Sequence, residues 1–339
     1  MRVTIVHNAV ADDDAPDERD VLVQAEAIQA ALSALGHEPG TLPCTLDLSE
    51  LKRRLTELQP DLIFNIVESL DGKGRLIHVI PFLLDALNVP YTGACAEAMC
   101  LTSHKVLAKQ RLAAAHMPTP PWIGPWPDDV PNLPPVGPDP AGMPDGKWIV
   151  KSVWEHASIG LDETTHLLCD HAERAATLLR ERAPRLGGAC FAERFIDGRE
   201  FNLALLAAPG GPQVLLPAEI LFEGYADQTL KIVGYRAKWD SDSYEFHHTP
   251  RRFDFPPEDA VLLARLRDLA LRCWRLFGLN GYARVDFRID AAGRPWILEI
   301  NANPCLSPDA GFAAALDASG ISYAGAVERI LSDTRKRPA

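Results

Sequence analysis

Two neighbouring apolar segments near the C-terminus, residues 284–290 (RVDFRID) and 294–301 (RPWILEIN), carry acidic and amide side chains. If they pair as a hairpin around the connection AAGR, strand alternation puts Glu299 and Asn301 on one face. This four-residue connection sets Asp286 directly opposite Glu299. Because like charges destabilise a sheet at this cross-strand distance, the pattern predicts a cation between them.

The three polar residues Asp286, Glu299 and Asn301 offer only oxygen atoms as ligands. Two carboxylates and an amide oxygen suit Mg²⁺ or Mn²⁺ better than zinc, and substrate phosphates usually complete a magnesium site. The alternative is a solvent-facing hairpin whose acids pair with Arg284 and Arg288, since exposed charged residues are common. Two facing acids followed directly by the sequence NANP form a more specific pattern than exposed charges do, so this pattern favours the metal site.

A magnesium site of this kind needs a bound phosphate, but the sequence contains no G-x-x-x-x-G-K-[ST] and no G-x-G-x-x-G motif. Two lysines remain as candidates. Lys105 lies in the first turn of a helix predicted over residues 101–118 and capped by Thr102 or Ser103, and Lys151 ends the predicted strand WIVK. A lysine beside a helix N-terminus can complement backbone N–H groups around an anion. For each lysine alone, simple solvent exposure is the alternative.

Composition narrows the class of protein. The 339 residues are 47% hydrophobic, enough for a large core, and their net charge of −12 disfavours nucleic acid and anionic membrane partners. The N-terminal MRVTIVHNAV predicts a strand rather than a secretory signal, and no apolar run reaches membrane-spanning length. The seven scattered cysteines contain no CxxC pair, so we expect a cytoplasmic protein.

The order of predicted elements indicates an α/β fold. Strands and helices alternate from the N-terminus to about residue 92, which predicts a parallel sheet with ligands at the carboxyl ends of its strands. Residues 117–147 are rich in proline and glycine and predict an extended connection near a subdomain boundary.

Further elements are predicted downstream. Residues 190–208 predict a hairpin with the turn IDGR, residues 213–222 and 230–239 predict strands, and residues 258–278 predict a helix.

Together these motifs resemble those of the ATP-grasp enzymes, and most closely those of the D-alanine:D-alanine ligase family. The similarity runs in order through DERDV, VPYTGA, LTSHKVLAKQRLAAA, IVKSVWEHASIGL, AERFIDGREF, YRAKW and RVDFRID to WILEINANP. It implies an ATP-grasp fold with an N-terminal parallel α/β subdomain at residues 1–100. A small central subdomain at 101–197 and a C-terminal subdomain at 198–339 would grip ATP between them.

The resemblance also implies roles for single residues. Lys105 and Lys151 match positions that contact the ATP phosphates, whereas Glu193, Phe195 and Ile196 match the adenine contacts and Glu200 the ribose contact. Asp286, Glu299 and Asn301 match the family's metal ligands. Arg284 matches an arginine at the reacting phosphate, Lys238 a lysine that reaches into the active site, and Glu18 the acid that binds the substrate ammonium. The implied cofactors are ATP and Mg²⁺ or Mn²⁺. Family members are often dimers, but the sequence alone leaves a homodimer and a monomer as open alternatives.

The implied reaction has two steps. A substrate carboxylate attacks the γ-phosphate of ATP, which gives an acyl phosphate and ADP. An amine then attacks the acyl phosphate and releases inorganic phosphate. The substrates are small carboxylates and amines, and positioning with charge neutralisation dominates such catalysis.

The amino-acid contacts depart from the family pattern. A serine and a tyrosine that support the first substrate are replaced by Ala157 and Trp239, and Glu68 lies near a histidine position. A glycine that leaves room for the incoming amine is Cys305, and a serine for the second substrate's carboxylate is Ala310. Replacement contacts from Ser307 or Asp309 are open, as is their use as a helix cap.

Three functions therefore compete. The main hypothesis is an ATP-dependent carboxylate–amine ligase that acts on something other than two D-alanines. The second is a divergent D-alanine:D-alanine ligase of cell-wall synthesis, and the third is a catalytically silent ATP-binding module. His247 and His248 could close over the phosphates or belong to a solvated loop.

Overall fold

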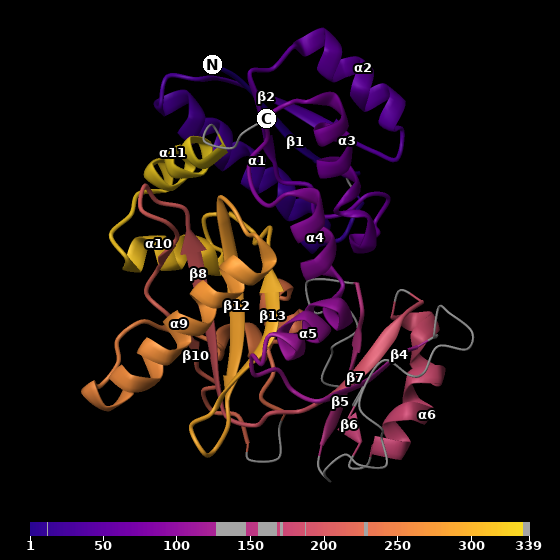
Figure 1. Cartoon of the computed structure of the whole chain (residues 1–339), viewed down its shortest axis with the longest axis vertical. Coiled ribbons are helices and arrows are strands. Elements are labelled where there is room, and N and C mark those ends of the chain that lie inside the picture. The colour runs from indigo at the N-terminus through magenta and orange to yellow at the C-terminus, as the bar shows by residue number, and fades with distance from the viewer. Residues whose placement is uncertain are drawn as a thin grey trace.

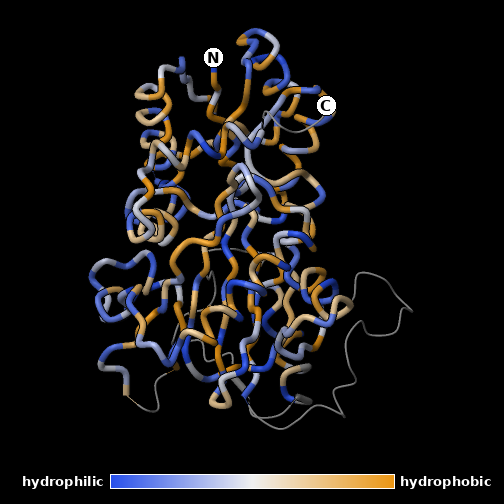
Figure 2. Tube along the Cα trace, turned by 60° about the vertical axis from the view of Figure 1, so that its left-hand side comes forward, coloured by the Kyte–Doolittle hydropathy of each residue, from blue (hydrophilic) through white to orange (hydrophobic). Residues whose placement is uncertain are grey.

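The computed structural model describes residues 1–11, 13–126, 147–154, 168–169, 172–186, 188–226 and 230–334. The strands form three sheets: the N-terminal sheet lies at one end of the long axis, and the C-terminal and central sheets lie next to each other in the other half of the view (Figure 1). Within the described part of the chain, no helix has the length and hydropathy to cross a membrane. Hydrophobic residues run through the interior strands of the trace, while many outer turns are hydrophilic (Figure 2).

The N-terminal part is a parallel sheet with the strand order β2-β1-β3, flanked by helices, as the sequence predicts. Strand β2 is absent from the sequence prediction because its two prolines and glycine are typical of a loop, and it lies at the sheet edge where prolines are tolerated. The elements are β1 (Arg2–Asn8), α1 (Pro16–Ala34), β2 (Glu38–Cys44), α2 (Leu48–Leu58), β3 (Leu62–Asn65), η1 (Gly74–Leu76), α3 (Val79–Leu87), α4 (Ala96–Ser103) and α5 (Lys105–Ala114).

The central part is a four-stranded antiparallel sheet with the order β4-β7-β5-β6. Helix α6 covers one face, where Ala175 and Leu179 pack against Trp148 and Val150. The elements are β4 (Trp122–Trp126), β5 (Trp148–Ser152), β6 (Leu168–Cys169), α6 (Ala172–Arg182), η3 (Ala183–Arg185) and β7 (Cys190–Arg194).

The C-terminal part is built on a six-stranded sheet with the order β11-β10-β8-β12-β13, to which β9 adds beside β8. Helix α9 packs its apolar stripe, including Leu266 and Cys273, on one face and ends at Gly278, whose φ of +62° suits glycine. The elements are β8 (Arg199–Leu206), β9 (Gln213–Val214), β10 (Ala218–Ile220), α7 (Tyr235–Trp239), α8 (Tyr244–His247), β11 (Arg251–Arg252), η4 (Pro257–Asp259), α9 (Ala260–Phe277), β12 (Tyr282–Ile289), β13 (Pro295–Asn301), α10 (Gly311–Ala318) and α11 (Tyr323–Thr334).

The first and last parts of the chain share one hydrophobic core. Val327 and Ile330 of α11 pack with Ile28 of α1 and with Tyr282 of β12. Figure 1 shows α11 beside α1, although the two helices lie almost at opposite ends of the sequence. This shared core holds the N-terminal sheet against the C-terminal sheet.

The predicted hairpin over residues 190–208 is wrong. Its two strands, β7 and β8, belong to different sheets, and the residues between them form a crossover. Gly198 has φ +139°, and a Cβ atom there would collide with the carbonyl oxygen of Ile289 on β12. Close passage of the chain over β12 therefore requires glycine, which the sequence pattern presented as an ordinary turn residue.

Two other local predictions also need correction. Residues 230–239 do not form a strand, because their second half is helix α7. The single helix predicted over residues 101–118 is two helices, α4 and α5. Thr102 donates to the carbonyl of Ala98 inside α4, and the side chain that caps α5 is that of His104, which accepts from Leu107 N at 3.1 Å.

Candidate active site

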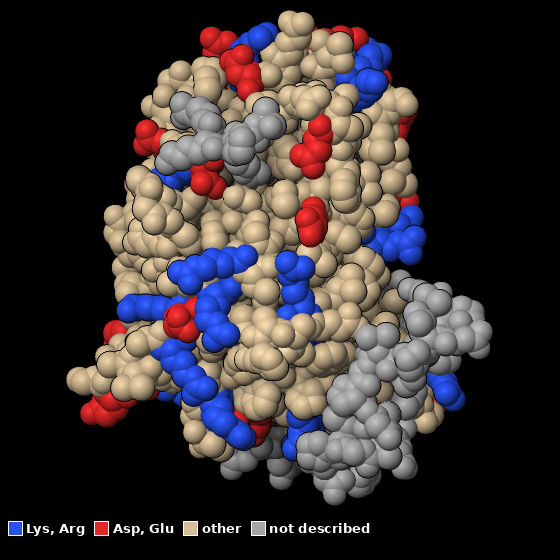
Figure 3. Space-filling model, in the orientation of Figure 1, with Lys and Arg blue, Asp and Glu red and all other residues tan. Residues whose placement is uncertain are grey.

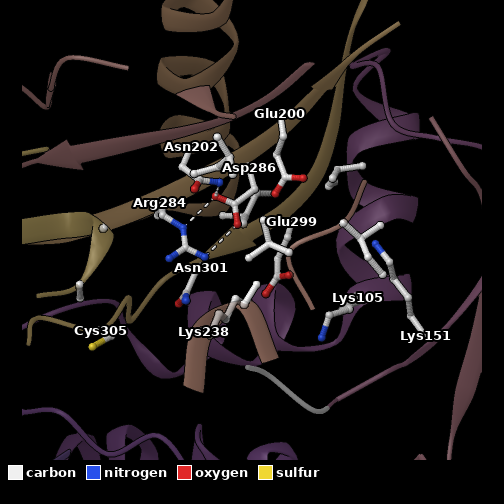
Figure 4. A pocket seen from close by; sticks show the side chains of 18 of the residues that line it. Lys105, Lys151, Glu200, Asn202, Lys238, Arg284, Asp286, Glu299, Asn301 and Cys305 are labelled. Atoms are coloured by element: carbon white, nitrogen blue, oxygen red, sulfur yellow. Dashed lines mark hydrogen bonds and ion pairs between the residues drawn. The ribbon is translucent and has the colours of Figure 1, made fainter. Parts of the chain in front are cut away.

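A cavity of about 710 Å³ is lined by residues from all three parts of the chain. The side chains around its metal and phosphate end come from β8, β12, β13, α5, α7 and β5 (Figure 4). Lys and Arg side chains gather across the middle of the face in Figure 3, so the net charge of −12 is not spread evenly over the molecule. The cavity volume suits a ligand of nucleotide size.

The hairpin β12–β13 sets Asp286 directly opposite Glu299, as predicted, but by a different route. The turn is tighter than predicted, because Asp290 N donates to Arg294 O at 3.1 Å and closes a three-residue loop. A register shift beyond Phe287 leaves Leu298 as an extra residue and restores the predicted pairing. The bulge also brings Leu298 and Glu299 to the cavity together.

The oxygen atoms of Asp286, Glu299 and Asn301 surround one space in the cavity (Figure 4). Arg284 donates to both oxygens of Asp286, at 2.8 and 2.9 Å, and Asn202 donates to Oδ1 at 2.9 Å. No cluster of three His, Cys, Asp or Glu residues occurs within the described ranges, so two carboxylates and an amide are the hard oxygen set available here. Such a set fits Mg²⁺ or Mn²⁺ when phosphate oxygens complete it.

Arg284 and Lys238 provide the positive charge at this end of the cavity. Burial lowers the pKa of Lys238, and the charge of Arg284 lowers it further, while Glu299 and Asp286 act in the opposite direction. For Arg284, the nearby carboxylates outweigh the effect of burial and raise the pKa. Both side chains line the cavity at the position expected for a phosphate.

The lysine pair predicted for phosphate binding is supported by a third lysine that the sequence interpretation missed. Lys105 and Lys151 line the cavity, and Lys151 donates to Glu193 Oε1. Lys109, which is 1% exposed, forms an ion pair of 2.9 Å with Glu193 Oε2. Burial raises the pKa of Glu193, but Lys109 and Lys151 more than compensate and hold it below its ordinary value. The sequence signal that could have identified Lys109 is its spacing of four residues from Lys105, which puts both lysines on one face of a helix.

The crossover after β7 forms an apolar wall. Phe195 and Ile196 line the cavity, and Phe195 N donates to Lys147 O at 2.8 Å. Arg288 lies over the Phe195 ring, at 5.7 Å from the centroid, and pairs with Glu200 at 2.7 Å. A flat, mainly apolar slot with a carboxylate at its end can accept a base and its sugar.

Comparisons with known proteins agree with this geometry. The family model described as "D-ala D-ala ligase C-terminus" matches residues 147–332. The D-alanine--D-alanine ligase of Methylococcus capsulatus is 31% identical over 316 residues, which cover 93% of this chain and 91% of the relative. That of Gloeobacter violaceus is 29% identical and covers 98% of both chains. The chain belongs to the D-alanine–D-alanine ligase family.

Solved structures agree at the level of the fold. The D-alanine--D-alanine ligase from Bacillus anthracis complexed with ATP has a TM-score of 0.71 and 19% identity, and the match covers 99% of this chain and 98% of that one. An uncharacterized protein of Sinorhizobium fredii is also similar, at 28% identity over 92% of this chain and 88% of its own. The protein is therefore an ATP-grasp ligase with the predicted α/β architecture.

In this family member, Glu18 lies outside the cavity wall, and two other acids line the amino-acid end of the cavity. Glu18 lies in the first turn of α1 beside Gly72 and is not part of the cavity wall. The acidic residues that do line this end are Asp20 and Glu68. The role predicted for Glu18 stays a prediction, while Asp20, two residues further along the helix, is the α1 side chain that reaches the cavity.

A hydrogen-bond network joins these acids to the loop after β13. Asp20 accepts from Ser307 Oγ at 2.7 Å and from Cys305 Sγ at 3.0 Å. Gln24 donates to Glu68 at 2.8 Å and accepts from Leu306 N at 2.9 Å. Ser307 is thus committed to Asp20 rather than to the cavity.

Burial governs the protonation of this end. Desolvation, helped by the charges of Asp20 and Asp17, raises the pKa of Glu68 to about 7. Desolvation and the nearby acids also raise the pKa of Cys305 well above its ordinary value. The Cys305 thiol is therefore protonated and acts as a donor to Asp20 instead of a nucleophile.

The remaining residues singled out in the sequence differ in whether they line the cavity. Trp239 lines it, and its indole N–H has no hydrogen-bond partner among the described residues. Ala157 lies outside the described residues. His247 and His248 bond to backbone carbonyls of their own segment, at 2.8 and 2.7 Å, and neither is part of the cavity wall.

Proposed function

We propose that the protein is an ATP- and Mg²⁺-dependent carboxylate–amine ligase whose substrates are not two D-alanines. The observation that carries the proposal is the contrast inside one cavity. Its nucleotide end has the lysines, carboxylates and apolar wall expected of the family, whereas its amino-acid end has Asp20, Glu68 and Cys305. A ligase that keeps its chemistry and changes its substrates would diverge in this way.

Several side chains would act on ATP directly. Lys105 and Lys151 would bind phosphate oxygens, and the wall formed by Phe195 and Ile196 would hold the base. Glu200 would face the sugar. Asp286, Glu299 and Asn301 would hold Mg²⁺ or Mn²⁺, which would supply charge neutralisation between the phosphates when bound.

The reaction would proceed in two balanced steps. A carboxylate oxygen of the first substrate forms a bond to the γ-phosphorus while the bond to the bridging oxygen of ADP breaks. The amine of the second substrate then attacks the acyl carbon, loses a proton and expels phosphate. Arg284 and Lys238 would neutralise the negative charge that moves between the transferred phosphoryl group and its oxygens.

A second candidate is D-alanine:D-alanine ligation. The named relatives favour it, since several at 28–32% identity are D-alanine--D-alanine ligases. The altered residues at the amino-acid end favour the first candidate. A catalytically silent ATP-binding module is set aside because the chain belongs to a family of ligases and has the whole oxygen set for a metal.

We further propose a cytoplasmic homodimer. The six cysteines in the described ranges are all free, which suits a reducing compartment. Light scattering on the purified chain tests the dimer.

The experiment that tests the function is ADP release from ATP and Mg²⁺ with D-alanine alone and with a panel of single amino acids and amines. Products are identified by mass. We expect release and a new amide with a pair other than two D-alanines, against a background measured without any amine. Release with D-alanine alone and formation of the D-alanine dipeptide would establish the second candidate instead.

A further inference from the structure

Arg251 lies on the edge strand β11 and faces the cavity. Strand pairing aligns Arg251 with Ile220 of β10, and Ile220 with Glu200 of β8. The row continues to Arg288 of β12. All four residues line the cavity. The next residue, Arg252, belongs to the opposite row and pairs with Glu219 on the other face of the sheet.

The guanidinium of Arg251 rests against the start of helix α10. A Cβ atom on Gly311 would lie 3.2 Å from Arg251 Nε and 3.6 Å from Cζ, so the absence of a side chain at Gly311 leaves room for the guanidinium. The residue before it, Ala310, is the N-cap of α10 and provides no capping side chain. Arg251, Asp309, Ala310 and Gly311 all line the cavity at this point.

Arg251 differs from the other cavity arginines in its pairing. Arg284 pairs with Asp286, and Arg288 pairs with Glu200. The Arg251 guanidinium forms no ion pair and no side-chain hydrogen bond with any residue of the described ranges. Desolvation and the charge of Arg284 lower its pKa, while Asp309 and Cys305 act in the opposite direction. The cavity thus holds one cation that lacks a close anion within the described structure.

We infer that Arg251 is a specificity-determining residue that binds the carboxylate of the second substrate. This inference rests on the proposed ligase function. It makes the amine that attacks the acyl phosphate an amino acid or a peptide rather than a simple amine. Arginine suits this task because its fork of N–H donors binds carboxylate in a bidentate manner.

The charges around Cys305 fit the same assignment. Asp20 and Glu68 approach Cys305 from the N-terminal part of the chain, and Arg251 approaches it from the C-terminal sheet. A carboxylate would be repelled by Asp20, and by Glu68 where Glu68 is ionised, and attracted by Arg251. An amino acid with its two opposite charges would therefore be oriented by this end of the cavity, whereas a simple amine would not.

The test measures binding, so it does not depend on turnover. The full chain is mixed with Mg²⁺ and a non-hydrolysable ATP analogue and screened by thermal shift. The probes are D- and L-amino acids, each as the free carboxylate and as the primary amide. We expect at least one carboxylate to stabilise the protein more than its own amide does. If no carboxylate exceeds its amide, the inference is overturned.

The best carboxylate is then titrated into variants. Arg251→Ala should weaken its binding by roughly tenfold to a hundredfold and remove the preference over the amide. Arg251→Lys should restore part of the affinity, and Arg54→Ala, an exposed arginine on α2, should change nothing. Circular dichroism checks that each variant is folded.

Two outcomes separate the inference from its foundation. If Arg251→Ala weakens binding of the ATP analogue and leaves binding of the carboxylate unchanged, Arg251 contacts the phosphates and the inference is wrong. If carboxylate binding depends on Arg251 but no amino-acid pair supports ADP release, Arg251 is a carboxylate-binding residue, but the ligase proposal fails and with it the ligand's place as second substrate.

Discussion

The two ends of the cavity handle charge in different ways. At the nucleotide end, buried charges are compensated: Glu193 is held between Lys109 and Lys151, and Arg284 lies on Asp286. At the amino-acid end, compensation is achieved by protonation instead, since burial raises the pKa of Glu68 and that of Cys305. The first end is built for a fixed, highly charged ligand, and the second has charges that a substrate would complete.

The largest effect should come from the proposed metal ligands Asp286, Glu299 and Asn301 at the nucleotide end of the cavity. Glu299→Gln keeps the shape of the side chain but removes one negative charge from the oxygen set. We expect kcat to fall by about a thousandfold or more, with little change in Tm, because phosphoryl transfer depends on charge neutralisation. Steady-state ADP release measures this effect. Full activity in this variant would remove Glu299 from the metal site.

The next effect separates the two lysines that hold Glu193. Lys109 is 1% exposed, so Lys109→Met leaves a buried carboxylate with one partner fewer and should lower the free energy of unfolding by about 3 kcal/mol. Lys151 is 19% exposed, and Lys151→Met should cost less stability but raise the KM for ATP. Urea unfolding and ATP titration of both variants measure this difference. Equal losses of stability would contradict the division into a structural and a ligand-binding lysine.

A smaller effect concerns pH and the amino-acid end. Burial raises the pKa of Glu68 from 4.5 to about 7 in the folded chain. The folded state therefore binds the Glu68 proton more tightly than the unfolded state does. The resulting contribution of Glu68 to the free energy of unfolding is complete below pH 4.5 and is lost as pH rises through 7. Glu68→Gln lacks the titrating group and should gain stability relative to the wild type as pH rises from 4.5 to 7, by at most about 3 kcal/mol.

Urea unfolding of the wild type and Glu68→Gln at several pH values checks this prediction. A constant difference between wild type and Glu68→Gln across the range would show that Glu68 titrates normally.

The smallest effect should come from restoring family residues at the amino-acid end. Cys305→Gly combined with Ala310→Ser removes the thiol that binds Asp20 and adds a hydroxyl at the N-cap of α10. We expect kcat/KM for D-alanine to rise a few-fold, about 1 kcal/mol or less, because most of the altered network remains. A rise that matches the best wild-type substrate pair would mean that two residues alone determine specificity.

At the nucleotide end, the sequence predicted one strand pairing correctly but not the path of the chain between the sheets. The pairing of Asp286 with Glu299 was predicted correctly. The real turn is one residue shorter than predicted, and the extra residue at Leu298 shifts the strand register back by the same amount. The alternation of side chains and their residue types are enough to predict such a strand pairing, because one face of the hairpin is polar and the other is apolar. The crossover at Gly198 was missed, since a turn within one sheet and a passage between two sheets use the same residues locally.

The amino-acid end was less predictable for a physical reason. Its wall combines α1, the loop after β3, the loop after β13 and the edge strand β11, which are distant in sequence. The family resemblance indicated Glu18, and no local pattern could show that Asp20 is the α1 side chain that lines the cavity. The sequence did not single out Arg251, because its lack of an ion pair depends on the fold.

The central claim is that this ligase has kept the nucleotide chemistry of its family and changed its substrates. The most direct measurement is a competition in one tube, in which the wild-type enzyme, ATP and Mg²⁺ meet an equimolar mixture of D-alanine and all other amino acids in both configurations. Product masses report relative kcat/KM. The account predicts a main amide product that is not the D-alanine dipeptide; a product dominated by that dipeptide would contradict it.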